Sequence, residues 1–94
     1  MSITINGITF DQVVYDREAD VLYLHVGDPS TAVDFDASPE GHAIRFDEKG
    51  RVVGITLVRP RHRMEHGHPV TVTIPTPERI TIDPDTLNAA LHAA

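Results

Sequence analysis

The stretch HAIRFDEKGRVVGITLV, residues 42–58, has the pattern of two β-strands joined by a short turn. In its first half, His42, Ile44 and Phe46 occupy alternate positions, so a strand would place all three on one face. The second half alternates in the same way, and its apolar residues on one face are Val53, Ile55 and Leu57. We therefore predict that this hairpin forms the centre of the hydrophobic core.

The turn of this hairpin is the sequence DEKG, residues 47–50. Gly50 can adopt the left-handed backbone conformation that a type I turn followed by a bulge requires. We interpret Asp47 and Gly50, together with Gly54 in the second strand, as structural residues.

A charged segment, DREAD at residues 16–20, lies between two further strands predicted at 13–15 and 21–26. Clustered carboxylates can bind a metal ion, but a calcium-binding loop needs a glycine and a distant glutamate at set spacings, and this segment lacks both. Asp16 and Asp20 can instead accept hydrogen bonds from backbone amides that a tight turn leaves unpaired. We interpret both as structural turn residues.

The remaining strands follow from the same alternation of apolar and polar residues. ITINGITF, residues 3–10, predicts a hairpin, because Asn6-Gly7 supplies the two positive-φ residues of a type I′ turn. Short strands are also predicted at 32–36 and 70–74, the latter as an edge or additional strand.

The end of the chain, IDPDTLNAALHAA, predicts a short helix. Pro84 fits the first helical position, and Leu87 and Leu91 lie four residues apart on one face. The expected fold class is α+β, with a small antiparallel, meander-like β-sheet and the short C-terminal helix packed on one face.

Composition limits the possible functions. Ninety-four residues are enough for a single domain, 1–94, and the absence of cysteine excludes disulfides, thiolate nucleophiles and cysteine-ligated zinc. The N-terminal stretch lacks the features of a signal peptide and no apolar run is long enough to span a membrane, so we expect a cytoplasmic protein. The net charge of -6 disfavours nucleic acid and anionic membranes as partners.

The opening motif Tyr-Asp-x-x-x-Asp-x-Leu-Tyr at residues 15–23 and the strand, Asp, turn, Gly and Gly-Ile motif at 47–55 resemble the small prokaryotic family called domain of unknown function 2283. The residues that carry the resemblance are Tyr15, Asp16, Asp20, Leu22, Tyr23, Asp47, Gly50, Gly54 and Ile55. The resemblance covers about residues 13–58 and implies no activity.

Two segments lie outside the resemblance. Residues 1–12 add the N-terminal hairpin, and residues 59–94 form a divergent extension with a strand and a helix. In this extension, RPRHRMEHGHPVTVTIPTPERI replaces the short amphipathic helix that often follows the Gly-Ile strand in the family.

Two side-chain clusters in the extension are candidate sites. Arg59, Arg61 and Arg63 could form a surface that contacts an acidic partner or a second copy of the chain. The His62–His68 loop contains H-x-x-x-H-x-H with a glutamate inside it, and two histidines plus a carboxylate can ligate zinc or nickel. The candidate metal ligands are His62, Glu65, His66 and His68.

Motifs for catalysis are missing from the chain. It has no G-x-S-x-G nucleophile elbow and no phosphate-binding glycine loop, so we expect no catalytic residue and no cofactor. We expect a non-enzymatic protein-interaction or regulatory module, for example an antitoxin-like protein, which acts through a sheet edge or the arginine surface and binds another protein or itself as a homodimer. The alternative is a small metal-binding protein or metal-dependent enzyme that uses the His62–His68 loop.

Overall fold

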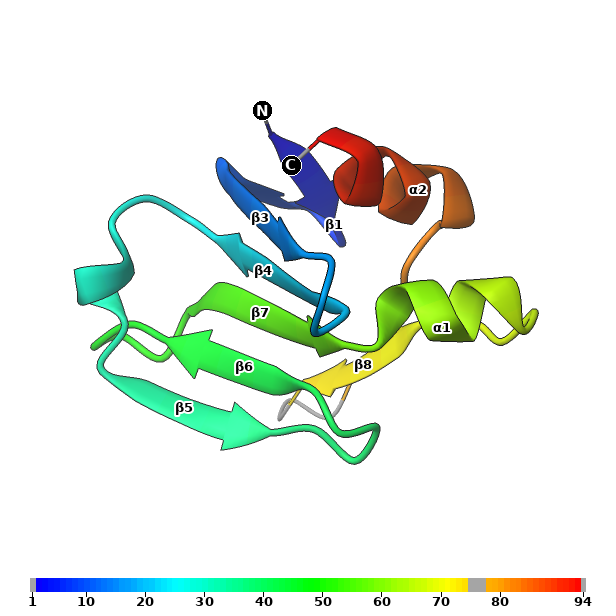
Figure 1. Cartoon of the computed structure of the whole chain (residues 1–94). Helices are drawn as coiled ribbons and strands as arrows, with labels where there is room; N and C mark the ends of the chain where they lie inside the picture. The colour runs from blue at the N-terminus through cyan, green and yellow to red at the C-terminus, as the bar shows by residue number, and fades with distance from the viewer. Residues whose placement is uncertain (1, 75–77, 94) are drawn as a thin grey trace.

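The computed structural model describes residues 2–74 and 78–93 (Figure 1). Its main element is a five-stranded antiparallel sheet. The strands are β3 (Gln12–Asp16), β4 (Val21–His25), β5 (Asp34–Ala37), β6 (Ala43–Phe46) and β7 (Val52–Val58). Their order in the sheet is β3-β4-β7-β6-β5. The sheet departs from chain order at one place, where β7, its longest strand, lies between β4 and β6.

Two hairpins and three short helical segments surround this sheet. They are β1 (Ile3–Ile5) paired with β2 (Ile8–Phe10), η1 (Pro29–Thr31), α1 (Pro60–Glu65), β8 (Thr71–Ile74) paired with β9 (Glu78–Thr81), and α2 (Pro84–Ala93). The α+β class with a short C-terminal helix is confirmed. Among the described residues, no helix combines the length and the apolar character needed to cross a membrane.

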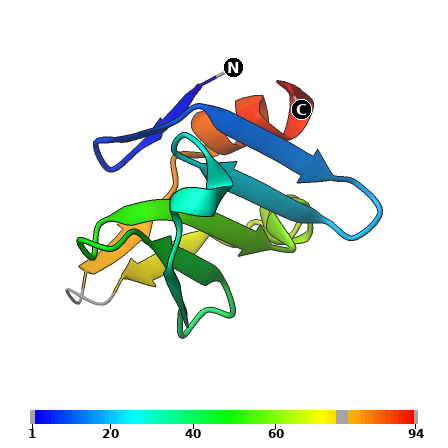
Figure 2. The same ribbon diagram turned by 90° about the vertical axis from the view of Figure 1, so that its left-hand side faces the viewer.

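One face of the five-stranded sheet, which we call the inner face, is covered by β1–β2, β8–β9 and α2 (Figures 1 and 2). The side chains at this interface form one cluster of buried apolar residues. It includes Phe10 from β2, Leu22, Leu24, Ile44, Ile55 and Leu57 from the sheet, Val72 and Ile80 from the second hairpin, and Leu87 and Leu91 from α2. The C-terminal helix therefore shares the cover of this face with two hairpins.

The predicted turns have the expected backbone conformations. Asn6 and Gly7 have φ values of 52° and 78°, as a type I′ turn requires. Gly50 has a φ of 77°, and its N–H donates to the carbonyl of Asp47 at 3.0 Å. The register of β6 against β7 also shifts between Arg45 and Phe46, an irregularity that was not predicted and that lies apart from the turn at Gly50.

Residues 59–81 differ most from the prediction. The segment Pro60–Glu65, expected to be a loop, is helix α1, so a short helix does follow the Gly-Ile strand in this chain. Strand β9 was not predicted, although its partner β8 was. In the sequence, prolines precede β9 and the strand begins with the charged Glu78 and Arg79, so the alternation of Ile80 with Ile82 is concealed.

Candidate functional site

On the opposite face of the five-stranded sheet, which we call the outer face, no hairpin and no α-helix of the described residues forms a covering layer, and only η1 lies beside it, near His25 (Figures 1 and 2). Because side chains alternate along a strand, each inward residue has an outward neighbour. Val14, Tyr23 and Val58 are outward neighbours of the buried Tyr15, Leu22 and Leu57. The exposed large hydrophobic side chains of the described chain are Val14, Tyr23, Val33, Phe35 and Val58. All five lie on the outer face or at its border.

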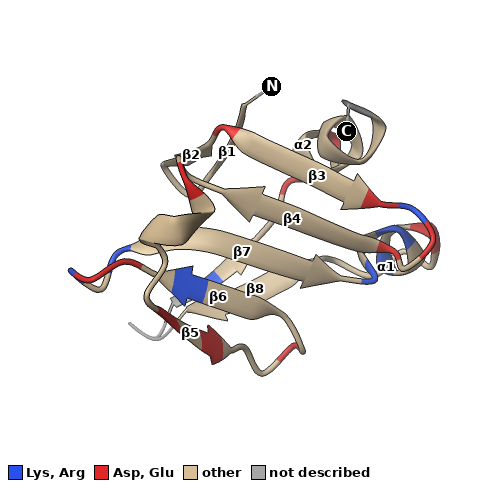
Figure 3. Ribbon diagram, turned by 60° about the vertical axis from the view of Figure 1, so that its left-hand side comes forward, with Lys and Arg blue, Asp and Glu red and all other residues tan. Residues whose placement is uncertain are grey.

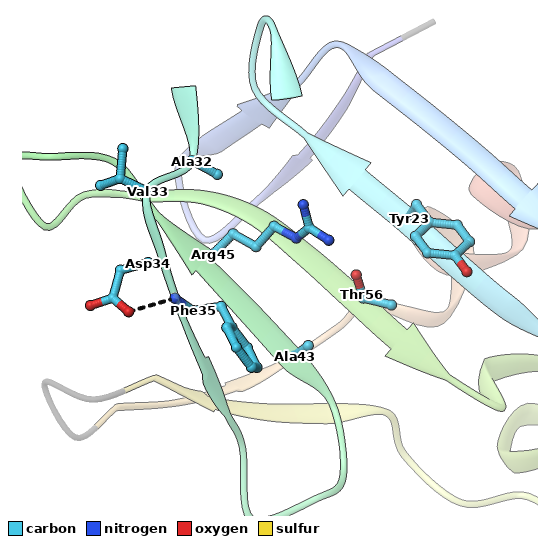
Figure 4. A pocket seen from close by; sticks show the side chains of 8 residues that line it. All are labelled: Tyr23, Ala32, Val33, Asp34, Phe35, Ala43, Arg45 and Thr56. Atoms are coloured by element: carbon cyan, nitrogen blue, oxygen red, sulfur yellow. Dashed lines mark hydrogen bonds between the residues drawn. The ribbon is translucent and has the colours of Figure 1, made fainter. Parts of the chain in front are cut away.

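A hollow of about 490 Å³ lies on this face between Tyr23 of β4 and Phe35 of β5 (Figure 4). Its lining consists of Tyr23, Ala32, Val33, Asp34, Phe35, Ala43, Arg45 and Thr56. The short side chains of Ala43 and Thr56 lie on the two strands that separate the aromatic residues. Phe35 is 69% exposed, so its ring stands at the rim of the hollow rather than in the protein interior.

The outer face has few charges (Figure 3). Arg45 is the basic residue of β6, while Asp34 and Asp36 lie on the neighbouring edge strand β5. The ion pairs found within the described residues are Arg51–Asp47 and Arg61–Glu65, so Arg45 takes part in neither. An exposed apolar surface with a single guanidinium is suited to protein recognition.

The free edge of the sheet at β5 is poorly suited to pairing with another strand. The N–H of Ser38 donates to the carbonyl of His42, so the backbone N–H of the alternate position Asp36 also faces β6. The N–H groups of Phe35 and Ala37 therefore point to the free edge, and each donates at 2.9 Å to the carboxylate of the preceding aspartate. Bonded donors and negative charge both oppose the addition of another strand.

Asp16 and Asp20, at the two ends of the β3–β4 turn, have different bonding partners. Asp16 Oδ1 accepts hydrogen bonds from the N–H groups of Glu18 and Ala19, at 3.1 and 3.2 Å. Asp20 has a left-handed backbone, with a φ of 53°, and its side chain extends away from the turn. Only Asp16 closes the turn itself.

Asp20 caps helix α1 from a distant part of the chain. Its Oδ1 accepts from the Arg61 N–H at 3.1 Å and its Oδ2 from the His62 N–H at 3.0 Å, while the Tyr15 hydroxyl donates to Oδ1 at 2.8 Å. Arg59, the residue at the N-cap position, has a φ of 58° and makes no capping bond with its side chain. A carboxylate on the first N–H groups also favours the helix dipole. The sequence analysis did not predict this contact. Pro60 could have indicated that a helix begins there, because proline is favoured at the first position of a helix.

The proposed metal ligands do not converge. His62 and His66 stack with ring centroids 4.1 Å apart, and His66 Nδ1 lies 2.7 Å from the His62 carbonyl oxygen. The Glu65 carboxylate faces Arg61 at 3.8 Å. His68 follows the left-handed Gly67, and its N–H donates to the Arg63 carbonyl. Within residues 2–74 and 78–93, no group of three or more potential ligands has the geometry to hold a metal.

Two of the three arginines in the basic cluster contact their own chain. The Arg61 guanidinium lies 6.0 Å from the centre of the Tyr15 ring, and Arg63 Nη2 donates to the Glu40 carbonyl at 3.4 Å. Arg59 remains exposed. The cluster thus contributes to the packing of α1 against the sheet.

Asp47 and Gly54 support the central hairpin. Asp47 accepts hydrogen bonds from the N–H groups of Lys49 and Arg51, and these bonds, led by the Arg51 N–H, lower the pKa of its carboxyl group. Gly54 lies beneath the imidazole ring of His25, and a Cβ atom at this position would be 2.9 Å from His25 Cδ2. The missing side chain lets the ring lie across β7 on the outer face.

His42 is a buried histidine on the inner side of β6 and is 2% exposed. Its Nδ1 accepts the Val58 N–H at 3.0 Å, so the neutral ring carries its proton on Nε2. Burial lowers the pKa of His42, and the nearby Arg63 lowers it further, against the opposing charge of Glu40.

We expect His42 to make folding sensitive to acid. Below pH 6.5, the ordinary pKa of histidine, the His42 side chain binds a proton in the unfolded chain but not in the folded chain. The free energy of unfolding therefore falls as the pH falls, until the pH reaches the lower pKa of His42 in the folded chain. The limiting slope for one proton is about 1.4 kcal/mol per pH unit. His42→Asn keeps an acceptor for the Val58 N–H but does not titrate. Urea denaturation between about pH 7 and 5 should therefore show a smaller slope for this variant. Equal slopes would contradict the prediction.

Glu40 connects the β5–β6 loop to β8. Its carboxylate accepts from the Thr73 N–H at 2.9 Å and from the Thr73 hydroxyl at 2.6 Å. Partial burial raises the pKa of Glu40, but these hydrogen bonds outweigh it and bring the pKa down to about 2. The second hairpin is thereby fixed beneath the sheet.

Comparison with family models gives a match over residues 12–59, just over half of the chain, to the family described as "Protein of unknown function (DUF2283)". Searches of curated proteins and of solved structures give no match. The matched segment contains the five strands of the main sheet, and therefore the whole outer face, but not the hairpins and helices that cover the inner face. The chain belongs to the DUF2283 family.

Proposed function

We propose that this chain is a protein-interaction module that binds its partner with the outer face of the five-stranded sheet. The observation that carries the proposal is the location of the five exposed large hydrophobic side chains, which all lie on or beside one face. Soluble monomers rarely expose a contiguous apolar patch of more than a few hundred Å², and larger patches mark interaction sites.

The residues that line the hollow favour recognition over catalysis. Two aromatic rings can supply most of the contact area, and Arg45 can supply a directed hydrogen bond or ion pair. Aromatic residues and arginine are the side chains most enriched at the energetic centres of protein interfaces. The β5 edge is a poorer candidate for the binding surface than the outer face, because the N–H groups of Phe35 and Ala37 are already bonded to aspartate side chains.

The proposal can be tested by photo-cross-linking in the native host. A photoreactive phenylalanine analogue is introduced at Val33, which is 65% exposed at the rim of the hollow. The matched control places the same analogue at Thr9, an exposed residue on β2 outside the outer face. We expect cross-links to protein from position 33 and few from position 9. Absence of cross-links at 33, or equal yields at both positions, would refute the proposed function.

A further inference from the structure

The properties of the outer face suggest which partner it fits. Five strands spaced about 4.8 Å apart, each about five residues long at about 3.4 Å per residue, cover roughly 400 Å² of flat sheet. Side chains standing on this plane increase the accessible area. This flat area is about half of the roughly 800 Å² that each partner buries in a typical stable complex, before the outward side chains are added.

The shape of the face is complementary to itself. Phe35 provides a protruding ring, and the adjacent hollow, with Ala43 and Thr56 between the two aromatic residues, provides a space for such a ring. A twofold dimer uses the same patch on both copies, so a projection and a recess side by side on one face satisfy its main requirement.

The charges favour the same arrangement. Each chain carries a net charge of -6, so two copies repel wherever their acidic surfaces meet. The outer face is the surface where β3, β4 and β7 present mainly uncharged side chains (Figure 3). Arg45 and Asp34 both line the hollow and offer opposite charges within one patch. A second copy can match both charges.

We propose that two copies of this chain associate face to face through their outer faces, with Phe35 of each copy in the hollow of the other and Arg45 facing the acidic β5 strand of the other copy. This inference rests on the proposed function and specifies its partner as a second copy of the chain. The interface is a sandwich of two sheets, a packing in which inner-facing side chains interdigitate across a gap of about 10 Å.

Sedimentation analysis of the purified full chain tests this inference. We expect a species with twice the 10.4 kDa mass of one chain. Phe35→Glu should raise the dissociation constant at least about 30-fold, the effect of losing a typical hot-spot residue. Asn88→Glu is the matched control, because it adds the same charge at an exposed position on α2, away from the outer face, and should leave the dimer intact.

Each outcome is decisive for one of the two proposals. A wild-type chain that stays monomeric at high concentration refutes self-association. The face-to-face dimer is also refuted if the Phe35→Glu variant dimerises as tightly as the wild type and has the same melting temperature. If the wild type is monomeric but position 33 cross-links to a different protein, the interaction module stands and only its partner is wrong. If position 33 gives no cross-links either, both proposals are wrong.

Discussion

Replacing Gly54 with valine is expected to lower the free energy of unfolding by about 3 kcal/mol, the upper part of the usual range for overpacked interiors. A Cβ atom at this position would lie 2.9 Å from His25 Cδ2 and 3.2 Å from Arg45 Cβ, well inside the normal carbon–carbon contact distance of about 3.5–4.0 Å. His25 is itself buried, so its ring has little room to move. Urea denaturation monitored by circular dichroism would measure the change.

Smaller changes at the same place give a graded test. Gly54→Ala should cost only about 1 kcal/mol, because alanine recovers part of the backbone entropy that glycine loses on folding. The double variant Gly54→Ala, His25→Ala should lose less stability than the sum of the two single losses. The His25→Ala change removes the imidazole atom that blocks the new Cβ at position 54. Thr56→Val, on the same strand and face, is the control and should be nearly neutral. A Gly54→Val variant as stable as the wild type would contradict this account.

Replacing Asp20 with alanine should cost about 3–4 kcal/mol, because several losses occur together. The Arg61 and His62 N–H groups lose their acceptor, the Tyr15 hydroxyl loses its partner, and alanine fits the left-handed backbone at this position poorly. The first turn of α1 should open, so amide hydrogen exchange at residues 61 and 62 should accelerate more than the global change in stability explains.

Two controls separate the helix cap from the turn. Asp20→Asn keeps one oxygen acceptor and tolerates the left-handed conformation, so its cost should be about half that of the alanine variant. Asp16→Ala removes only the two bonds inside the turn and should cost about 1 kcal/mol. Equal effects of Asp16→Ala and Asp20→Ala would mean that Asp20 acts only as a turn residue.

The sequence predicts those parts of the fold that are determined by residues close together along the chain. Asn6-Gly7 specifies its turn because both residues tolerate positive φ. The alternation in 42–58 specifies the central hairpin because one face must be buried. The pairing of β7 with β4 could not be predicted, because the paired residues are 29 to 37 positions apart in the sequence.

The candidate site was harder to predict for the same reason. Val14, Tyr23, Phe35 and Val58 come from four different strands, and none of them stands out among the other strand residues in the sequence. Their common exposure results from the absence of a covering layer, which only the three-dimensional arrangement reveals. The histidines and arginines of residues 59–68 form a conspicuous sequence pattern, yet only His62 and His66 lie together, and the described residues hold no group of three potential metal ligands.

The place of β7 in the sheet also determines when the sheet can assemble during synthesis. Strands β3 and β4 form one local hairpin and β5 and β6 another, and in the five-stranded sheet β7 is the strand that pairs with both. A nascent chain that has emerged only as far as Gly50 therefore contains the strands of two separate hairpins but lacks the strand that joins them. The five-stranded sheet becomes continuous only after residues 52–58 leave the ribosome, so its assembly during synthesis must wait for the last of its strands.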